Sequence, residues 1–154
     1  MNKEEFVSRY FPLAQDAGKR FSMNPAIILA QAALESAWGT SYGALVRNNF
    51  FGITASGSPN EFWDGSFSVS KNLYQLKFRE YATARDSFMD FARLISQRYQ
   101  MAHQVSHDSA RYARAIAYSP YIDESNGDNR EDYRRGILSS YREIVDIIKK
   151  KELT

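Results

Sequence analysis

The stretch "NPAIILAQAALESAWG", from Asn24 to Gly39, organises the fold. Asn24 is a typical helix N-cap, Pro25 suits the first helical position, and Gly39 stands where a helix commonly ends. The apolar residues between them lie all round the helix instead of along one stripe, which indicates burial on every side. We therefore predict a central helix against which the rest of the chain packs.

Helical patterns occur on both sides of this stretch. Near the start, Asn2 and Glu5 resemble a capping box ahead of apolar residues at helical spacing. Thr83 and Asp86 form a similar cap pair before a third periodic segment. The expected helices outside the central one cover residues 2–21, 83–99, 109–119 and the amphipathic segment that follows the polar loop at 123–129.

Residues 48–81 have a different character, rich in Gly, Ser, Asn and aromatic side chains. Short alternating runs such as "FSVS" and "LYQLKFREY" indicate strands, so we predict a loop followed by a β-hairpin lobe at about 55–81, with its turn near Lys71 and Asn72. The sequence thus predicts an α+β chain that is mainly α, forming one domain over residues 1–154.

Composition narrows the chemistry that the chain can carry. A formal net charge of +2 gives no strong field for nucleic acid, and the absence of cysteine excludes disulfides and thiol chemistry. His103 and His107 lack the third ligand that zinc needs, so we expect no metal and no cofactor. No apolar run approaches transmembrane length, and the start "MNKEEFVSRY" shows no signal peptide.

Glu35 is a carboxylic acid within the apolar central helix, one turn after Gln31 on the same face. Burial disfavours the ionised form of a carboxyl, and so does the negative end of the helix dipole. Both effects raise the pKa of Glu35 toward the range in which a carboxyl donates a proton near neutral pH. The alternative is a side chain that reaches solvent or pairs with an arginine at the helix end.

Two motifs in order, "LESAWG" at 34–39 and "NNFFGI" at 48–53, followed by "FREY" at 78–81, carry a family resemblance. Together they resemble the glucosaminidase family of peptidoglycan hydrolases, glycoside hydrolase family 73, over nearly the whole chain. The first motif alone is less specific, because lytic transglycosylases carry a similar Glu-Ser pair. The resemblance implies a lysozyme-like fold with a groove between a helical body and the hairpin lobe.

The resemblance also implies site residues. Glu35 matches the catalytic acid of the family. The second acidic residue of the family lies in the hairpin lobe, where Glu61 is the best match and Asp64 is a rival. A family tyrosine that lies beside the acid corresponds to Tyr121, with Tyr118 as the alternative.

Four further residues are candidates for contacting sugar. We expect Trp63 and Phe62 to present exposed rings, which stack on the apolar faces of pyranoses. Asn49 and Phe51 either fix the loop that precedes the lobe or line the groove.

The expected function is cleavage of the β-1,4 bond after N-acetylglucosamine in peptidoglycan, with water activated by Glu61 or replaced by the N-acetyl group of the substrate as internal nucleophile. Closure of the hairpin lobe would assemble the two carboxylates. The expected partner is the glycan strand, met by a monomer in the cell envelope or outside the cell, without membrane insertion. A lytic transglycosylase or muramidase of the same fold, and a non-catalytic wall-binding or assembly module, are the alternatives.

Overall fold

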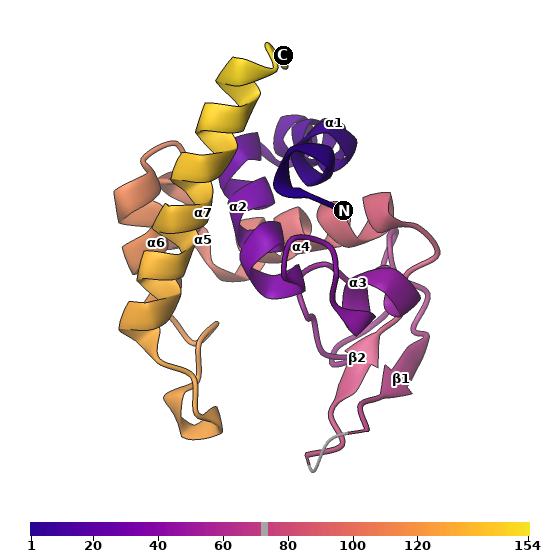
Figure 1. Ribbon diagram of the computed structural model, residues 1–154. Coiled ribbons are helices and arrows are strands. Elements are labelled where there is room, and N and C mark those ends of the chain that lie inside the picture. The colour runs from indigo at the N-terminus through magenta and orange to yellow at the C-terminus, as the bar shows by residue number, and fades with distance from the viewer. Residues whose placement is uncertain (72–73) are drawn as a thin grey trace.

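The structure is a computed structural model and describes residues 1–71 and 74–154. Helices build the larger part of the molecule, and a two-stranded sheet forms a small lobe beside them (Figure 1). The mainly helical α+β class predicted from the sequence is confirmed. In chain order the elements are α1 (Lys3–Phe21), α2 (Pro25–Ser36), α3 (Tyr42–Arg47), β1 (Phe67–Val69), β2 (Lys77–Arg79), α4 (Ala84–Arg98), α5 (Gln100–Gln104), α6 (Ser109–Ala117), the 3₁₀ turn η1 (Glu124–Asn126) and α7 (Arg130–Lys150).

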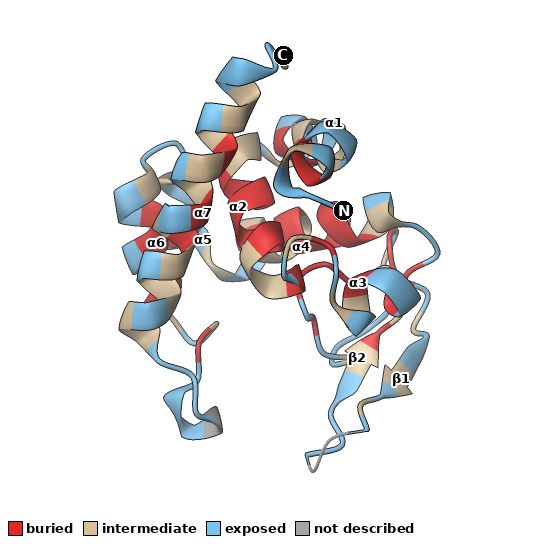
Figure 2. Ribbon diagram, in the orientation of Figure 1, coloured by how far each residue is buried: buried red, intermediate tan, exposed pale blue. Residues whose placement is uncertain are grey.

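Helix α2 is the buried centre of the helical body (Figure 2). The side chain of Asn24 accepts a hydrogen bond from the Ala26 amide at 3.1 Å, and the helix ends at Ala37, which is left-handed with a φ of 50°. Residues 27–33 are all buried, and α1 and α7 both pack against this helix. The predicted central helix is therefore confirmed, with its end two residues before Gly39.

The small lobe contains the predicted hairpin. Strands β1 and β2 pair antiparallel, with Phe67 opposite Arg79 and Val69 opposite Lys77. The strands are short, and residues 55–66 form turns and an isolated bridge between Asn60 and Trp63. The turn was predicted near Lys71 and Asn72, and Asn72 lies outside the described part of the chain.

A buried carboxylate joins the lobe to the helical body. Asp90, on α4, has a side chain with 0% exposure, and it accepts hydrogen bonds from Arg79 Nη1 at 2.7 Å and Arg93 Nε at 2.9 Å. The Tyr81 hydroxyl and Asn60 Nδ2 donate to the same carboxylate. A buried carboxylate is tolerated only when charge and hydrogen bonds compensate its lost hydration, as they do here. The base of the lobe is thereby fixed to α4.

Helices α6 and α7 complete the body, because α7 packs against both α2 and α6. The side chain of Asn129 caps α7 by accepting a hydrogen bond from the Asp132 amide at 3.0 Å. The loop between the two helices lines one cavity together with residues of the lobe. Within the described ranges, no helix has both the length and the apolar character required to cross a bilayer.

Candidate active site

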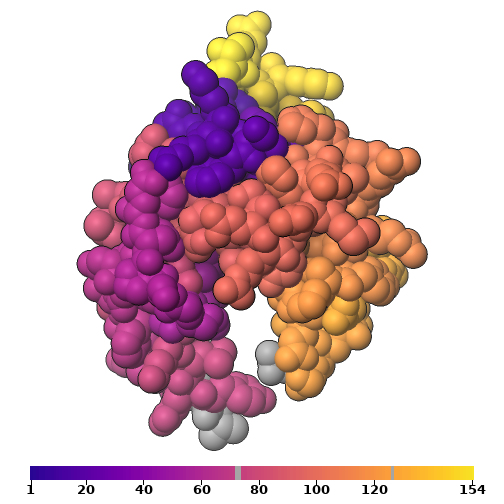
Figure 3. Space-filling model, turned by 180° about the vertical axis from the view of Figure 1, so that it is seen from behind, coloured from indigo at the N-terminus to yellow at the C-terminus, as the bar shows by residue number. Residues whose placement is uncertain are grey.

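A cavity of about 830 Å³ lies between the helical body and the lobe. Its walls are the end of α2, the loop at 51–60, strand β2, the last turns of α4, the loop at 120–128 and the start of α7. Seen from behind, the molecule is hollowed between the magenta lobe and the orange segment that follows α6 (Figure 3). Among the described residues that line the cavity, the carboxylates are Glu35 and Asp128.

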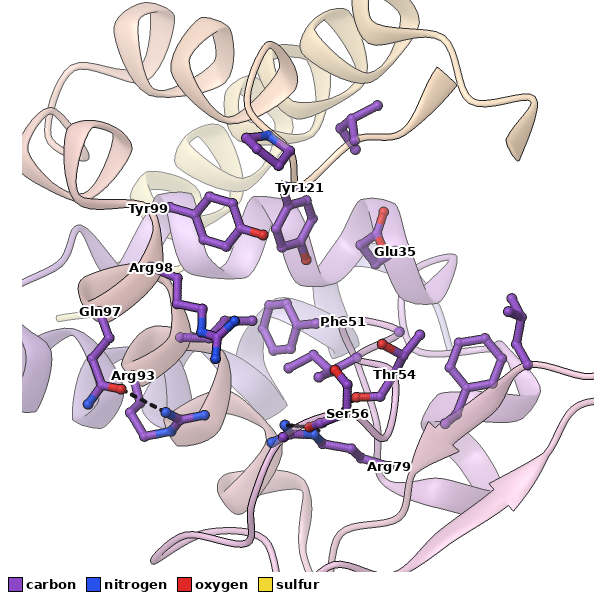
Figure 4. Close-up of a pocket in the computed structure, with 18 of the residues that line it drawn as sticks. Glu35, Phe51, Thr54, Ser56, Arg79, Arg93, Gln97, Arg98, Tyr99 and Tyr121 are labelled. Carbon is purple, nitrogen blue, oxygen red and sulfur yellow. Dashed lines mark hydrogen bonds between the residues drawn. The ribbon is translucent and has the colours of Figure 1, made fainter. Parts of the chain in front are cut away.

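Glu35 occupies the last turn of α2 and faces the cavity (Figure 4). The loop that follows α3 passes close to its carboxyl at Gly52, whose φ is +64°, a backbone conformation that favours glycine. A side-chain carbon at Gly52 would lie 3.6 Å from Glu35 Oε2. The "FFGI" part of the sequence motif thus brings backbone alongside the carboxyl that the "LES" part supplies.

The environment of Glu35 favours its neutral form. Desolvation by burial is the largest influence and raises the pKa of Glu35 from 4.5 to about 7. A hydrogen bond from the Tyr133 hydroxyl opposes that rise, and the negative charge of Asp128 adds to it. The apolar sequence around Glu35 predicted that burial would raise its pKa. A pKa of about 7 leaves the carboxyl half-protonated near neutral pH.

A chain of hydrogen bonds leads from the buried interior to Glu35. The Tyr112 hydroxyl donates to Gln31 Oε1 at 2.6 Å, and Gln31 Nε2 donates to the Tyr133 hydroxyl oxygen at 3.0 Å. Because that oxygen already accepts a hydrogen bond from Gln31, the hydroxyl of Tyr133 is free to donate its own proton in a hydrogen bond to the carboxyl of Glu35. Gln31 is fully buried, so its position on the Glu35 face of α2 is explained by this chain.

Two of the other predicted residues line the same cavity as Glu35. Tyr121 lies beside it, and the charge of Glu35 contributes to raising the pKa of the Tyr121 phenol, after burial. Phe51 stacks on Phe91 with ring centroids 3.9 Å apart and forms part of the cavity wall. Tyr99, which contacts Tyr121 edge to face at 5.4 Å, extends this aromatic surface (Figure 4).

The predicted second carboxylates do not line the cavity. Glu61 is bound by Arg20 at the end of α1, with Nη1 to Oε1 at 2.8 Å and Nη2 to Oε2 at 2.6 Å. This pair holds the pKa of Glu61 below its ordinary value and turns the carboxylate toward α1. Asp64 accepts a hydrogen bond from the Ser66 amide at 2.9 Å within a turn of the lobe. The structure therefore does not bring either residue together with Glu35.

The two proposed sugar platforms are covered. Phe62 is 8% exposed and contacts Phe21 edge to face, while Trp63 is 4% exposed. The guanidinium of Arg79 lies 3.9 Å from the Trp63 ring centroid, and the indole N–H donates to the Ser66 carbonyl at 2.8 Å. The expectation of exposed rings is wrong, because Phe62 packs into the hydrophobic core against α1 and Trp63 is covered by Arg79.

Asn49 and Tyr118 are also placed away from the cavity surface. Asn49 is buried, and its Nδ2 donates to the carbonyls of Ile53 and Arg79, both at 3.0 Å, so that it ties the loop to β2. The Tyr118 hydroxyl donates to Glu131 at 2.5 Å on the outer side of the loop before α7. Of the two tyrosines left open by the sequence, Tyr121 is the one beside Glu35.

Several cavity residues were not singled out by sequence reasoning. Tyr133 has the spacing of a core residue on α7, and nothing in its local sequence marks a contact with Glu35. Asp128 lies in the polar loop at 123–129, in which the sequence singled out no functional residue. Among residues 1–71 and 74–154, no three His, Asp or Glu side chains lie close enough together to hold a metal ion.

Comparison with known proteins places this geometry in a family. The sequence profile described as mannosyl-glycoprotein endo-beta-N-acetylglucosaminidase, the glucosaminidase profile, matches residues 11–150. The chain belongs to the glucosaminidase family. The resemblance seen in the two motifs is thereby confirmed.

Relatives and solved structures in this family support the same placement. The chain is 33% identical over 132 residues to the peptidoglycan hydrolase FlgJ of Vibrio parahaemolyticus, which covers 77% of this chain and 42% of that protein. It superposes on the glycoside hydrolase domain of Salmonella typhimurium FlgJ with a TM-score of 0.75 at 25% identity, covering 99% of this chain and 94% of that one. A peptidoglycan hydrolase of Sphingomonas sp. A1 gives 0.70 at 25% identity, with 92% of both chains covered.

The comparisons inform both the fold of the chain and the share of its relatives that it covers. The likeness to glycoside hydrolase domains confirms the lysozyme-like architecture predicted from the sequence. The chain spans less than half the length of the curated relatives that it matches.

Proposed function

We propose that this chain is a peptidoglycan hydrolase that cleaves the β-1,4 bond after N-acetylglucosamine, with Glu35 as general acid. The observation that carries the proposal is a cavity carboxyl whose pKa is raised to about 7 in a chain of the glucosaminidase family. The relatives described as peptidoglycan hydrolases support the choice of substrate. A cavity of about 830 Å³ that is open between body and lobe suits an extended polymer.

Glu35 is suited to donate a proton to the leaving glycosidic oxygen. Burial keeps a substantial share of the carboxyl protonated near neutral pH, so the proton is present when substrate binds. After transfer, the hydrogen bond from Tyr133 stabilises the carboxylate that remains. Tyr133 therefore assists most in the transition state, where negative charge develops on Glu35.

The group that completes the displacement is proposed to come from the substrate. Glu61 is 60% exposed and engaged with Arg20, and it would have to leave that pair to reach the cavity. Strand β1, with the sequence "FSV", offers no carboxylate in its place. The carbonyl oxygen of the N-acetyl group would instead attack the anomeric carbon as the glycosidic bond breaks, and water would then open the resulting oxazolinium ion to give the reducing end. We propose that Tyr121, which lines the cavity with Glu35, orients the N-acetyl group.

The setting follows from the substrate. We propose that the chain acts as a monomer on glycan strands of the wall, in the cell envelope or outside the cell. A single cavity lined from both lobes accounts for the reaction without a second subunit.

Mass spectrometry of digested, purified peptidoglycan tests the proposal. We expect fragments with reducing N-acetylglucosamine ends from the wild-type chain, and a loss of rate of about a hundredfold or more in Glu35→Gln. Glu61→Gln is the matched control, and we expect it to keep its rate within a fewfold. Anhydro sugar ends would instead identify a lytic transglycosylase, and no cleavage by the folded wild type would favour a wall-binding module.

A further inference from the structure

The cavity has a basic end formed by the last turns of α4. Arg93, Gln97 and Arg98 line the cavity there, and Arg93 and Gln97, four residues apart, lie on one face of the helix. In Figure 4 these three side chains lie on the opposite side of the cavity from Glu35. We refer to Arg93, Gln97 and Arg98 as the α4 basic wall.

Among the described residues, carboxylates neutralise the positive charge around the α4 basic wall only in part. The single carboxylate of Asp90 is shared by two guanidinium groups, Arg79 at 2.7 Å and Arg93 at 2.9 Å, which leaves one positive charge over. Within residues 1–71 and 74–154, Arg98 makes no ion pair. Two surplus charges therefore face this end of the cavity, in a chain whose formal net charge is only +2.

Arg93 is held in place with donors to spare. Its Nε is fixed by Asp90, and its Nη1 donates to Gln97 Oε1 at 2.9 Å, so two contacts orient the guanidinium plane along α4. The remaining N–H groups of Nη1 and Nη2 donate to no protein group in the part of the chain that the structure describes. With a side chain only 20% exposed, Arg93 is less screened by water and salt than a surface arginine. A fixed guanidinium of this kind suits a carboxylate.

The substrate of the proposed function carries such carboxylates. The sugars of a glycan strand are uncharged where the lactyl group of N-acetylmuramic acid is amide-linked to its peptide, so the negative charges near the strand belong to that peptide. Converting the peptide carboxylates to amides removes these charges and leaves the sugars unchanged, whereas removing the whole peptide would free the lactyl carboxylate of each muramic acid. We propose that the α4 basic wall is a subsite for a peptide carboxylate of the substrate, and that the chain prefers strands whose peptide carboxylates are free to strands in which they are amidated. This inference rests on the proposed function and specifies its substrate.

Comparing the rates on two substrates distinguishes a failure of the proposed subsite from a failure of the proposed reaction. Peptidoglycan freed of other wall polymers is divided into one sample with free peptide carboxylates and one in which a carbodiimide and an ammonium salt have converted those carboxylates to amides. For each sample, the release of reducing ends gives kcat/KM. The preference is the kcat/KM of the sample with free carboxylates divided by that of the other sample. We expect Arg98→Gln to lower that ratio about fivefold, through a higher KM for the sample with free carboxylates, and Arg98→Glu to lower it further.

Arg142→Gln is the matched control, because it removes the same charge from an exposed position of α7 outside the cavity. We expect it to leave the ratio unchanged. A ratio unaltered by both Arg98 variants overturns the subsite, and so does an equal loss on the two substrates, since a role in folding or in holding α4 together would affect both alike. A wild-type chain that releases no sugar from either sample overturns the proposed function itself.

Discussion

Removing the hydroxyl of Tyr133 should change the pKa of Glu35 in a direction that the structure predicts. Tyr133 donates a hydrogen bond to the carboxyl of Glu35 and lowers its pKa, against the larger effect of burial. Gln31 holds the hydroxyl in that direction at 3.0 Å. Replacing Tyr133 by Phe keeps the ring and deletes the bond, so the pKa of Glu35 should rise above its value of about 7.

The size of this rise follows from the two protonation states. A hydrogen bond to an ionised group contributes about 1.5–3 kcal/mol, and one between neutral groups about 0.5–1.5 kcal/mol. The difference, roughly 1–1.5 kcal/mol, corresponds to about one pH unit. Since the acid must be protonated to act, the basic limb of kcat/KM should move from about pH 7 to about pH 8 in Tyr133→Phe. The maximal rate should fall, because the carboxylate formed during proton transfer loses its donor.

The assay is the pH dependence of reducing-end release from peptidoglycan by the wild type and Tyr133→Phe. Tyr141→Phe, which removes a hydroxyl from the same helix two turns further on, serves as control and should leave the limb in place. The buried Nε2 of Gln31 loses its acceptor in Tyr133→Phe, so thermal unfolding is recorded to show that the variant is folded. A folded variant whose basic limb stays at the wild-type pH, or moves to lower pH, would refute the reasoning.

Three further predictions concern the carboxylates. The pKa of Glu35 is higher in the folded chain, about 7, than its ordinary 4.5, so its contribution to stability is complete below pH 4.5 and is lost as the pH rises through 7. As the pH rises from 4.5 to 7, urea unfolding should therefore show the free energy of unfolding of Glu35→Gln increasing by about 3 kcal/mol relative to that of the wild type. Equal pH dependences of the two free energies would contradict this. Asp90→Ala leaves Arg79 buried without its carboxylate and should cost about 3–5 kcal/mol in the same measurement, whereas a loss below 1 kcal/mol would argue against the anchor. Asp128→Asn removes a charge that raises the pKa of Glu35, so the basic limb of activity should move to lower pH, by less than the Tyr133→Phe shift; an upward shift would contradict the assignment.

The central helix and its carboxyl could be predicted because their causes are local. The cap at Asn24 and the apolar residues around α2 are readable from consecutive positions, and burial of Glu35 follows from them. The hydrogen bonds that tune Glu35 were not predictable in the same way. Tyr112 and Tyr133 are far from Gln31 in sequence, and periodicity marks both simply as core residues.

The errors lie in the lobe, where contacts are long-range. The "NEFWDG" stretch has the composition of an exposed loop, which suggested a free carboxylate and free aromatic rings. In the fold, Arg20 from the end of α1 takes Glu61, and Arg79 from β2 covers Trp63. Neither arginine is marked by its own sequence neighbourhood, so only the tertiary arrangement distinguishes a catalytic position from a structural one.

A carbon-13 NMR titration of the Glu35 carboxyl in the folded chain tests whether the cavity holds an acid suited to neutral pH. We predict a midpoint of about 7, coinciding with the basic limb of kcat/KM measured on peptidoglycan. A midpoint near the ordinary 4.5 would leave too little protonated Glu35 at neutral pH, and it would contradict the assignment of this residue as the general acid.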